Sequence, residues 1–169
     1  MIVRVLAVIG TLGLVLASCS SSSVPEDAAS APPGFRGLFE DDTAPPLPAL
    51  NVYQIAAGKN LYAENCASCH RADLAGDPNW MTPDENGVYP PPPHDATGHT
   101  WHHDDGLLLG IIRDGLQGFP SGMPTFAGIL TDDEILSILE FLKSEWGDEE
   151  RTFQWQATWR VRESRTSQP

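Results

Sequence analysis

The chain has 169 residues, of which 41% are hydrophobic, and this suffices for one globular domain with appendages. Its formal net charge of −13 argues against nucleic acid as a partner, because phosphates repel an acidic surface and no basic stripe compensates. Three cysteines in a chain of this length exclude a scaffold held together by many disulfides.

Residues 1–18 are expected to be an export signal. Arg4 precedes an apolar stretch from Val5 to Ala17, which has the length of a signal-peptide core and is short for a transmembrane helix. The stretch runs into Leu-Ala-Ser-Cys, which resembles the lipobox of bacterial lipoproteins. That resemblance implies cleavage before Cys19, lipidation of Cys19, and anchoring to a bacterial membrane facing the periplasm. An ordinary secretory signal is the alternative, and the choice between inner and outer membrane stays open.

Residues 19–50 are expected to form a flexible tether between this anchor and the domain. The segment is rich in Ser, Pro, Ala and acidic residues, and its apolar residues lack helical or strand periodicity. Such a composition buries too little apolar surface to offset the entropy of ordering the chain. We therefore place the folded domain at residues 51–147, followed by a C-terminal extension at 148–169.

The sequence Cys66-Ala67-Ser68-Cys69-His70 has the CxxCH pattern of c-type haem attachment. Each sulfur adds to one vinyl group of the porphyrin, and the two-residue gap lets both thiols reach neighbouring vinyls. The residue that follows then presents an imidazole to the iron. A thioredoxin-like redox disulfide would need a βαβ pattern nearby, and the sequence has none. A zinc site would need a second pair of ligands, and only the later histidines could supply one. The pattern thus predicts one covalent haem c on Cys66 and Cys69, with His70 as an axial iron ligand.

Helices are expected before and after this motif. Residues 55–62 run into Cys66 and place Gly58 and Tyr62 on one face, where the glycine would let a second helix approach closely. A middle helix through 107–112 is expected to start at Asp104 or Asp105 and to stop at Gly115.

The C-terminal helix of the domain has the clearest local signals. Thr131 and Glu134 form a capping box, and an apolar stripe with helical spacing runs from Ile135 to Trp146. Gly147 stands where a glycine commonly ends a helix.

The segment Ser-Gly-Met-Pro-Thr-Phe places Met123 in a loop, 53 residues after His70. Together with the CxxCH motif and the two flanking helices, this loop resembles the distal-ligand loop of class I cytochromes c. The resemblance extends over residues 52–146. It implies an all-α fold in which N- and C-terminal helices cross around one covalent haem, with Met123 as the sixth iron ligand. The implied role is transfer of single electrons between respiratory or periplasmic redox partners, without catalysis. Met81 lacks the loop context of a ligand.

Residues 77–105 form a His- and Pro-rich insertion, longer than the minimal loop of that family. Three interpretations stay open. In the first, Trp101 covers a haem edge or propionate while the histidines bond to backbone; in the second, the histidines hold a second metal such as copper. In the third, a histidine replaces Met123 as axial ligand. The side chains singled out for a second metal or for haem-edge contacts are His94, His99, Trp101 and His103.

The C-terminal extension carries conflicting patterns. Trp155 and Trp159 have helical spacing, whereas the surrounding apolar residues alternate as in a strand. Acidic residues at 148–150 favour a short helix packed on the domain.

Partners of such a carrier are expected to present a basic docking face to this acidic chain. The alternative functions are copper handling by the histidine cluster, or a haem-based sensor or enzyme with a labile sixth ligand.

Overall fold

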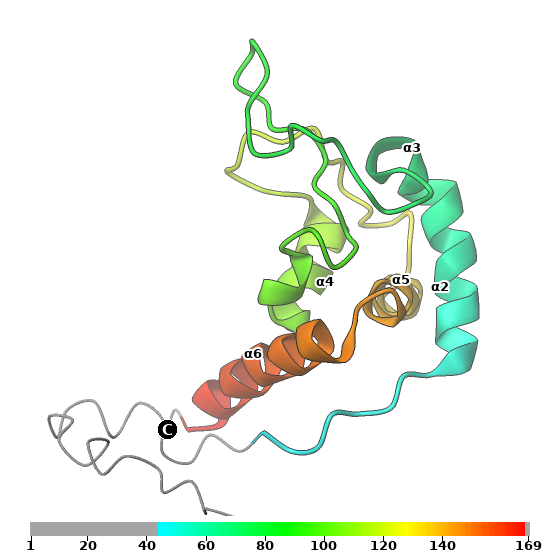
Figure 1. The fold of residues 1–169 in the computed structure, drawn as a ribbon, viewed down its shortest axis with the longest axis vertical. Helices are drawn as coiled ribbons and strands as arrows, with labels where there is room; N and C mark the ends of the chain where they lie inside the picture. The colour runs from blue at the N-terminus through cyan, green and yellow to red at the C-terminus, as the bar shows by residue number, and fades with distance from the viewer. Residues whose placement is uncertain (1–43, 168–169) are drawn as a thin grey trace, which may run out of the picture. The chain divides into compact units, whose positions relative to one another are not determined.

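A computed structural model of the chain describes residues 44–167. The predicted signal peptide, Cys19 and the tether up to residue 43 lie outside these residues. The elements in chain order are α2 (Val52–Asn65), α3 (Ala67–His70), the 3-10 helix η2 (Thr100–His102), α4 (Asp105–Asp114), α5 (Asp132–Ser144) and α6 (Asp148–Thr166) (Figure 1). Residues 44–167 contain two isolated β-bridges and no strand, so the prediction of an all-α fold is confirmed. Within that range, no helix combines the length and apolar character needed to cross a bilayer.

Helices α2 and α5 cross in close contact, as the glycine on the first helix predicts. A Cβ atom added to Gly58 would overlap the backbone carbonyl of Ser137, so only glycine permits this approach. One turn later, Tyr62 is buried with its ring centroid 5.4 Å from that of Phe141. In Figure 1, α5 is seen nearly end-on beside α2, which makes the crossing visible.

Helix α5 supplies five of the eleven buried hydrophobic residues of the described core, and it begins at the predicted capping box. The Thr131 hydroxyl accepts from the Glu134 backbone N–H, while the Glu134 carboxylate accepts from the Thr131 N–H. Its end differs from the prediction, because the helix stops at Ser144. Gly147 has an ordinary φ of −73° and caps the start of α6 instead of ending α5. The buried Trp146 lies between the two helices and donates from Nε1 to the carbonyl of His94 at 2.8 Å.

Helix α4 has both predicted boundaries. The Asp104 carboxylate accepts from the backbone N–H of Leu107, and Gly115, with φ 73°, ends the helix. Its buried face carries Leu108 and Ile112, which belong to the same core cluster as the apolar residues of α5.

Helix α6 is the predicted helical extension, and at 19 residues it is longer than expected. Its buried face is polar. Thr158 Oγ1 accepts from the backbone N–H of Asp105 at 3.0 Å, and Gln154 Nε2 donates to Asp105 Oδ1 at 2.7 Å. Lys143 Nζ of α5 lies 2.7 Å from Asp105 Oδ1, so three helices meet at this carboxylate.

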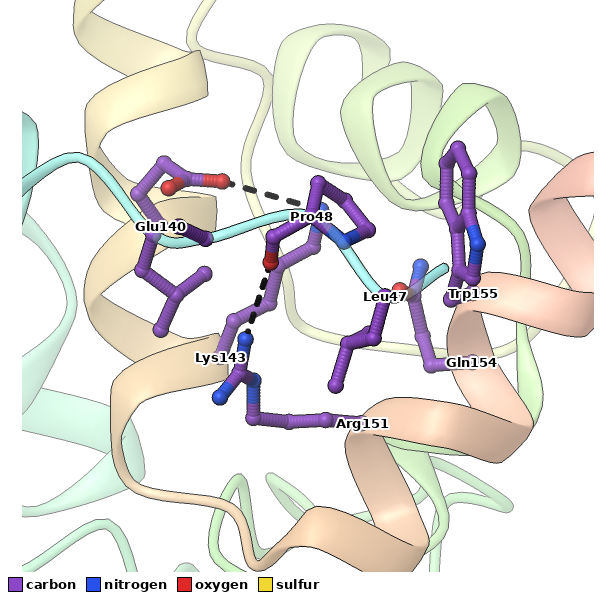
Figure 2. Close-up of a pocket in the computed structure, with 9 residues that line it drawn as sticks. Leu47, Pro48, Glu140, Lys143, Arg151, Gln154 and Trp155 are labelled. Atoms are coloured by element: carbon purple, nitrogen blue, oxygen red, sulfur yellow. Dashed lines mark hydrogen bonds and ion pairs between the residues drawn. The ribbon is translucent and has the colours of Figure 1, made fainter. Parts of the chain in front are cut away.

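The last residues of the predicted tether lie against the domain. We call residues 45–50 the strap, because this extended segment contacts α5 and α6 (Figure 2). Trp155 Nε1 donates to the carbonyl of Pro45 at 2.7 Å, and Arg151 donates to the carbonyl of Pro48 at 3.1 Å. The strap continues into Asn51, whose side chain caps the start of α2.

Candidate functional site

The two cysteines and His70 of the CxxCH motif lie in a single turn of chain. Cys66 closes α2 by donating its N–H to the carbonyl of Tyr62, and α3 follows directly. The His70 N–H donates to the Cys66 carbonyl at 2.9 Å, which fixes the histidine backbone against the first cysteine. Both thiols are free, with Cys66 half-buried and Cys69 exposed. Burial raises the pKa of the Cys66 thiol to about 11, and the nearby Cys69 acts in the same direction.

His70 is a buried, neutral imidazole whose tautomer can be deduced. Its Nδ1 lies 3.0 Å from the backbone oxygen of Pro92. A carbonyl oxygen only accepts, so Nδ1 carries the proton and Nε2 keeps the lone pair that a metal ion requires. Burial lowers the pKa of His70, although the bond to Pro92 opposes that shift. The Pro92 carbonyl therefore orients the ring and keeps its Nε2 available for a metal ion.

The proline run of the insertion supplies hydrogen-bond acceptors to its neighbours. Proline has no N–H, so the backbone of this run can only accept. Three successive carbonyls of the run accept hydrogen bonds. The Pro91 carbonyl accepts from the Asp77 N–H at 2.8 Å, and the Pro92 carbonyl accepts from His70 Nδ1 at 3.0 Å. The Pro93 carbonyl accepts from the Thr100 hydroxyl at 3.2 Å.

Two glycines allow the chain to close around this run. Gly76 has φ 57°, and a Cβ atom there would lie 2.5 Å from the carbonyl carbon of Pro92. A Cβ atom on Gly98 would overlap the carbonyl oxygen of Pro93. The Pro92 and Pro93 carbonyls are thus placed by close backbone approaches at Gly76 and Gly98.

The turn after His70 has an unusual backbone that Tyr62 supports. Arg71 has φ 67° and ψ 153°, a region that non-glycine residues rarely occupy. The Tyr62 hydroxyl donates to the Arg71 carbonyl at 3.0 Å, with the His70 carbonyl 3.4 Å away. Burial raises the pKa of Tyr62, so the phenol remains a donor.

Met123 is half-buried and packs at the edge of the core. The carbonyl of Arg113 accepts from the N–H groups of Phe126 and Ala127 at 3.0 and 2.8 Å, which ties the following segment to the end of α4. A Cβ atom on Gly115 would lie 3.2 Å from the Met123 carbonyl oxygen. The segment crosses the same end of the domain as α3 in Figure 1. The role of Met123 as an iron ligand stays a prediction.

The histidines of the insertion separate into two groups. His94 stacks on His70, with ring centroids 4.0 Å apart. His99 stacks on Trp80 at 4.8 Å, and its ring centroid lies 5.2 Å from that of His103. Among residues 44–167, no group of three His, Cys, Asp or Glu side chains is placed to hold a metal ion. The copper interpretation therefore finds no preformed site in this part of the chain.

Two buried ring nitrogens of the insertion have no partner within the described chain. These are Nδ1 of His99 and Nε1 of Trp101. Buried polar groups are rarely left unpaired, and an indole N–H only donates, so Trp101 points to an acceptor outside the protein. A haem carries two propionate carboxylates, which fits the interpretation of Trp101 as a haem-edge or propionate contact. With two free thiols and a neutral His70, the residues present suit one covalent haem c.

Several residues that build the site were not identified from the sequence. The sequence shows a proline-rich insertion, but the specific role of the Pro92 carbonyl depends on tertiary contact. The close approaches at Gly76 and Gly98 also depend on tertiary contact, and so does the acceptor role of Thr100. One available signal was the absence of N–H groups in the run, which leaves its carbonyls free for other donors.

Comparison with known proteins agrees with this geometry. The family model described as cytochrome c matches residues 55–146, more than half of the chain. The FixP subunit of a cbb3-type cytochrome c oxidase from Bradyrhizobium sp. (strain ORS 278) is 28% identical over 103 residues, which cover 60% of this chain and 31% of that protein. The match thus spans about a third of the length of this curated relative. No solved structure matches the chain.

Proposed function

The chain belongs to the cytochrome c family, whose members bind one covalent haem c, and on that premise we propose that it is a membrane-anchored carrier of single electrons. The observation that carries the proposal is the state of His70. Its Nδ1 is occupied by the Pro92 carbonyl, and its Nε2 lone pair is free, directly after the Cys66 and Cys69 thiols. This arrangement supplies both the covalent attachment and one axial ligand.

Each site residue has a distinct role in this proposal. Cys66 and Cys69 would hold the haem through thioether bonds, and His70 and Met123 would bind the iron. The haem supplies an iron that alternates between the ferric and ferrous states. Because the Pro92 carbonyl and the Tyr62 hydroxyl fix the histidine and the turn behind it, the ligand set needs little rearrangement during electron transfer.

Export and lipidation at Cys19 would hold the carrier on a bacterial membrane facing the periplasm. Haem attachment outside the cytoplasm agrees with the export signal in the sequence. The name of the relative, a subunit of a cytochrome c oxidase, supports respiratory partners. With a formal charge of −13, the chain favours a partner with a basic docking face, through a small and transient contact.

Spectra of the full chain, produced with the haem attachment machinery, test the proposal. Ferric haem with Met ligation has a weak long-wavelength absorption band. We expect this band in the wild type and its loss in Met123→Ala. Met81→Ala is the matched control, because Met81 is 71% exposed and should leave the band unchanged.

Two results would overturn the proposal. Attached haem without the band in the wild type would indicate a histidine or an open sixth position, and so a sensor or enzyme. Failure to attach haem in the presence of the machinery would contradict the role given to Cys66 and Cys69.

A further inference from the structure

The ring of His94 lies face to face with the ring of His70. The two centroids are 4.0 Å apart and the planes differ by 25°. At this centroid distance the two rings are in van der Waals contact, so the orientation of one ring restricts the orientation of the other. The two histidines are 24 residues apart in the chain, and the insertion brings them together.

The His94 ring is itself fixed by hydrogen bonds. Its Nδ1 lies 2.9 Å from Thr100 Oγ1, and that hydroxyl donates its only proton to the Pro93 carbonyl at 3.2 Å. The bond between His94 and Thr100 must therefore use the proton on Nδ1 of the histidine. Thr100 is buried, so this chain of bonds is held within the fold.

The backbone of His94 is anchored on both sides. Its N–H donates to the Leu74 carbonyl at 2.8 Å, and its own carbonyl accepts from Trp146 Nε1 at 2.8 Å. The edge of the Tyr62 ring lies against the imidazole, with centroids 6.4 Å apart. Neither backbone bond depends on the His94 side chain, so the imidazole is not needed to make them.

Rings in this face-to-face contact attract each other by dispersion, and the attraction weakens when one ring turns away from the other.

We propose that His94 is a positioning residue for the axial ligand His70, which it holds by ring stacking without binding iron itself. The inference rests on the proposed ligation by His70. The Pro92 bond fixes one nitrogen of the His70 ring, and stacking restricts rotation of the ring about its bond to Cβ. A ring stacked on His70 cannot also approach the iron from the opposite side, so His94 does not compete with Met123.

The orientation of an axial imidazole plane is observable, because it sets the haem-methyl NMR shifts and the g values of a low-spin ferric haem. We would record both, with the reduction potential, on the full-length holoprotein. In His94→Leu, which has no flat ring, we expect altered methyl shifts and g values. In His94→Phe, which keeps a flat ring but not the Thr100 bond, we expect values between those of Leu and wild type.

His102→Leu is the matched control. His102 is an exposed histidine of the same insertion that contacts Trp101 and Phe153. We expect wild-type spectra from this variant. Spectra of His94→Leu that cannot be distinguished from those of His102→Leu would overturn the inference.

A further variant covers the case in which His94→Leu fails to mature. Thr100→Val keeps the shape of the side chain and removes the acceptor for Nδ1, so we expect a shift of the same methyl signals. Wild-type spectra from Thr100→Val and from His94→Ala, which removes the stacked ring, would then overturn the inference. A wild-type protein whose iron has no histidine ligand would overturn the proposed function and this inference together. Normal ligation in the wild type, with methyl shifts and g values that do not change in the variants, would overturn the inference alone.

Discussion

At the scale of single residues, Tyr62 connects the helix crossing to the turn behind His70. Its ring packs against Phe141 of α5, and its hydroxyl donates to the carbonyl of Arg71. A non-glycine residue with the φ and ψ of Arg71 costs roughly 1–3 kcal/mol, which the surrounding contacts must offset. One side chain therefore contributes to both packing and local backbone geometry.

Replacing Tyr62 with phenylalanine should reveal that second contribution. The ring contacts remain, but the Arg71 carbonyl loses its donor, and we expect a loss of about 1 kcal/mol in unfolding free energy. Denaturant unfolding of the holoprotein measures the change. Tyr53→Phe is the control, because Tyr53 is 84% exposed and its substitution should be nearly neutral. Equal changes in both variants would contradict the role given to the Tyr62 hydroxyl.

The sequence predicts the local part of the site and misses its tertiary part. Cys66, Cys69 and His70 form a contiguous motif, so their chemistry can be inferred from spacing alone. The acceptor of His70 is 22 residues away, in a run whose partners depend on how the insertion folds back. No local pattern specifies that Pro92, rather than another carbonyl of the run, meets His70.

At the scale of secondary-structure elements, the glycines of α2 and α4 have opposite surroundings. Gly58 faces the backbone of Ser137 without room for a Cβ atom, whereas a Cβ atom on Gly110 would meet nothing within 4 Å. Alanine is favoured over glycine in a helix by about 1 kcal/mol, so only tertiary contact can reverse the preference.

These surroundings predict effects of opposite sign. Gly58→Ala should destabilise the domain by roughly 1–3 kcal/mol, because α2 and α5 must separate to admit the methyl group. Gly110→Ala should stabilise it by up to about 1 kcal/mol. Thermal unfolding of both variants provides the measurement. Stabilisation by Gly58→Ala would show that the helices do not approach as closely as described.

The capping box of α5 predicts a pH effect. Hydrogen bonds from the backbone and hydroxyl of Thr131 lower the pKa of Glu134 from its ordinary 4.5. A carboxyl group with a depressed folded-state pKa contributes stability above its ordinary pKa, and the contribution is lost as pH falls through the folded value.

Glu134→Gln should therefore remove part of the acid sensitivity, because glutamine keeps the capping geometry without titrating. We expect the unfolding free energy of this variant to fall less steeply than that of the wild type as pH decreases through and below 4.5. Urea unfolding across that pH range measures the slopes. Identical slopes would exclude the contribution of this carboxylate, and Glu64→Gln on the exposed face of α2 serves as the control.

The element boundaries show where local signals are sufficient. The capping box and the N-cap Asp104 lie where the sequence predicts them, because each depends on residues within one turn. The end of α5 was predicted wrongly at Trp146 and Gly147, since the bond from Trp146 to the distant His94 is not visible in the local pattern. The ambiguous tail is helical because Gln154 and Thr158, one turn apart, both face buried partners.

At the scale of the whole molecule, the strap joins the start of the domain to its C-terminal helix. Its carbonyls at Pro45 and Pro48 accept from α6, and the chain then enters α2. The C-terminal extension is thus an integral part of the described fold.

Removing the two donors should release the strap. In a Trp155→Phe/Arg151→Gln double variant, two hydrogen bonds are lost, and at about 1 kcal/mol each the local opening equilibrium should rise by roughly tenfold or more. Thermolysin, which cleaves before leucines such as Leu50, should then cut this segment correspondingly faster. Thr152→Ala, on an exposed part of α6, is the control. Unchanged cleavage in the double variant would mean that other contacts hold the strap.

The proline run has a further consequence for how molecules of this protein meet one another. Residues 90–93 belong to no helix, and the first three of them are partly exposed. An incoming strand needs N–H groups as well as carbonyls to pair, and prolines at an edge deny it the donors. The segment that presents the acceptor for His70 is therefore a poor template for intermolecular β-sheet. Chains that have not yet acquired haem therefore have one fewer site from which aggregation can begin.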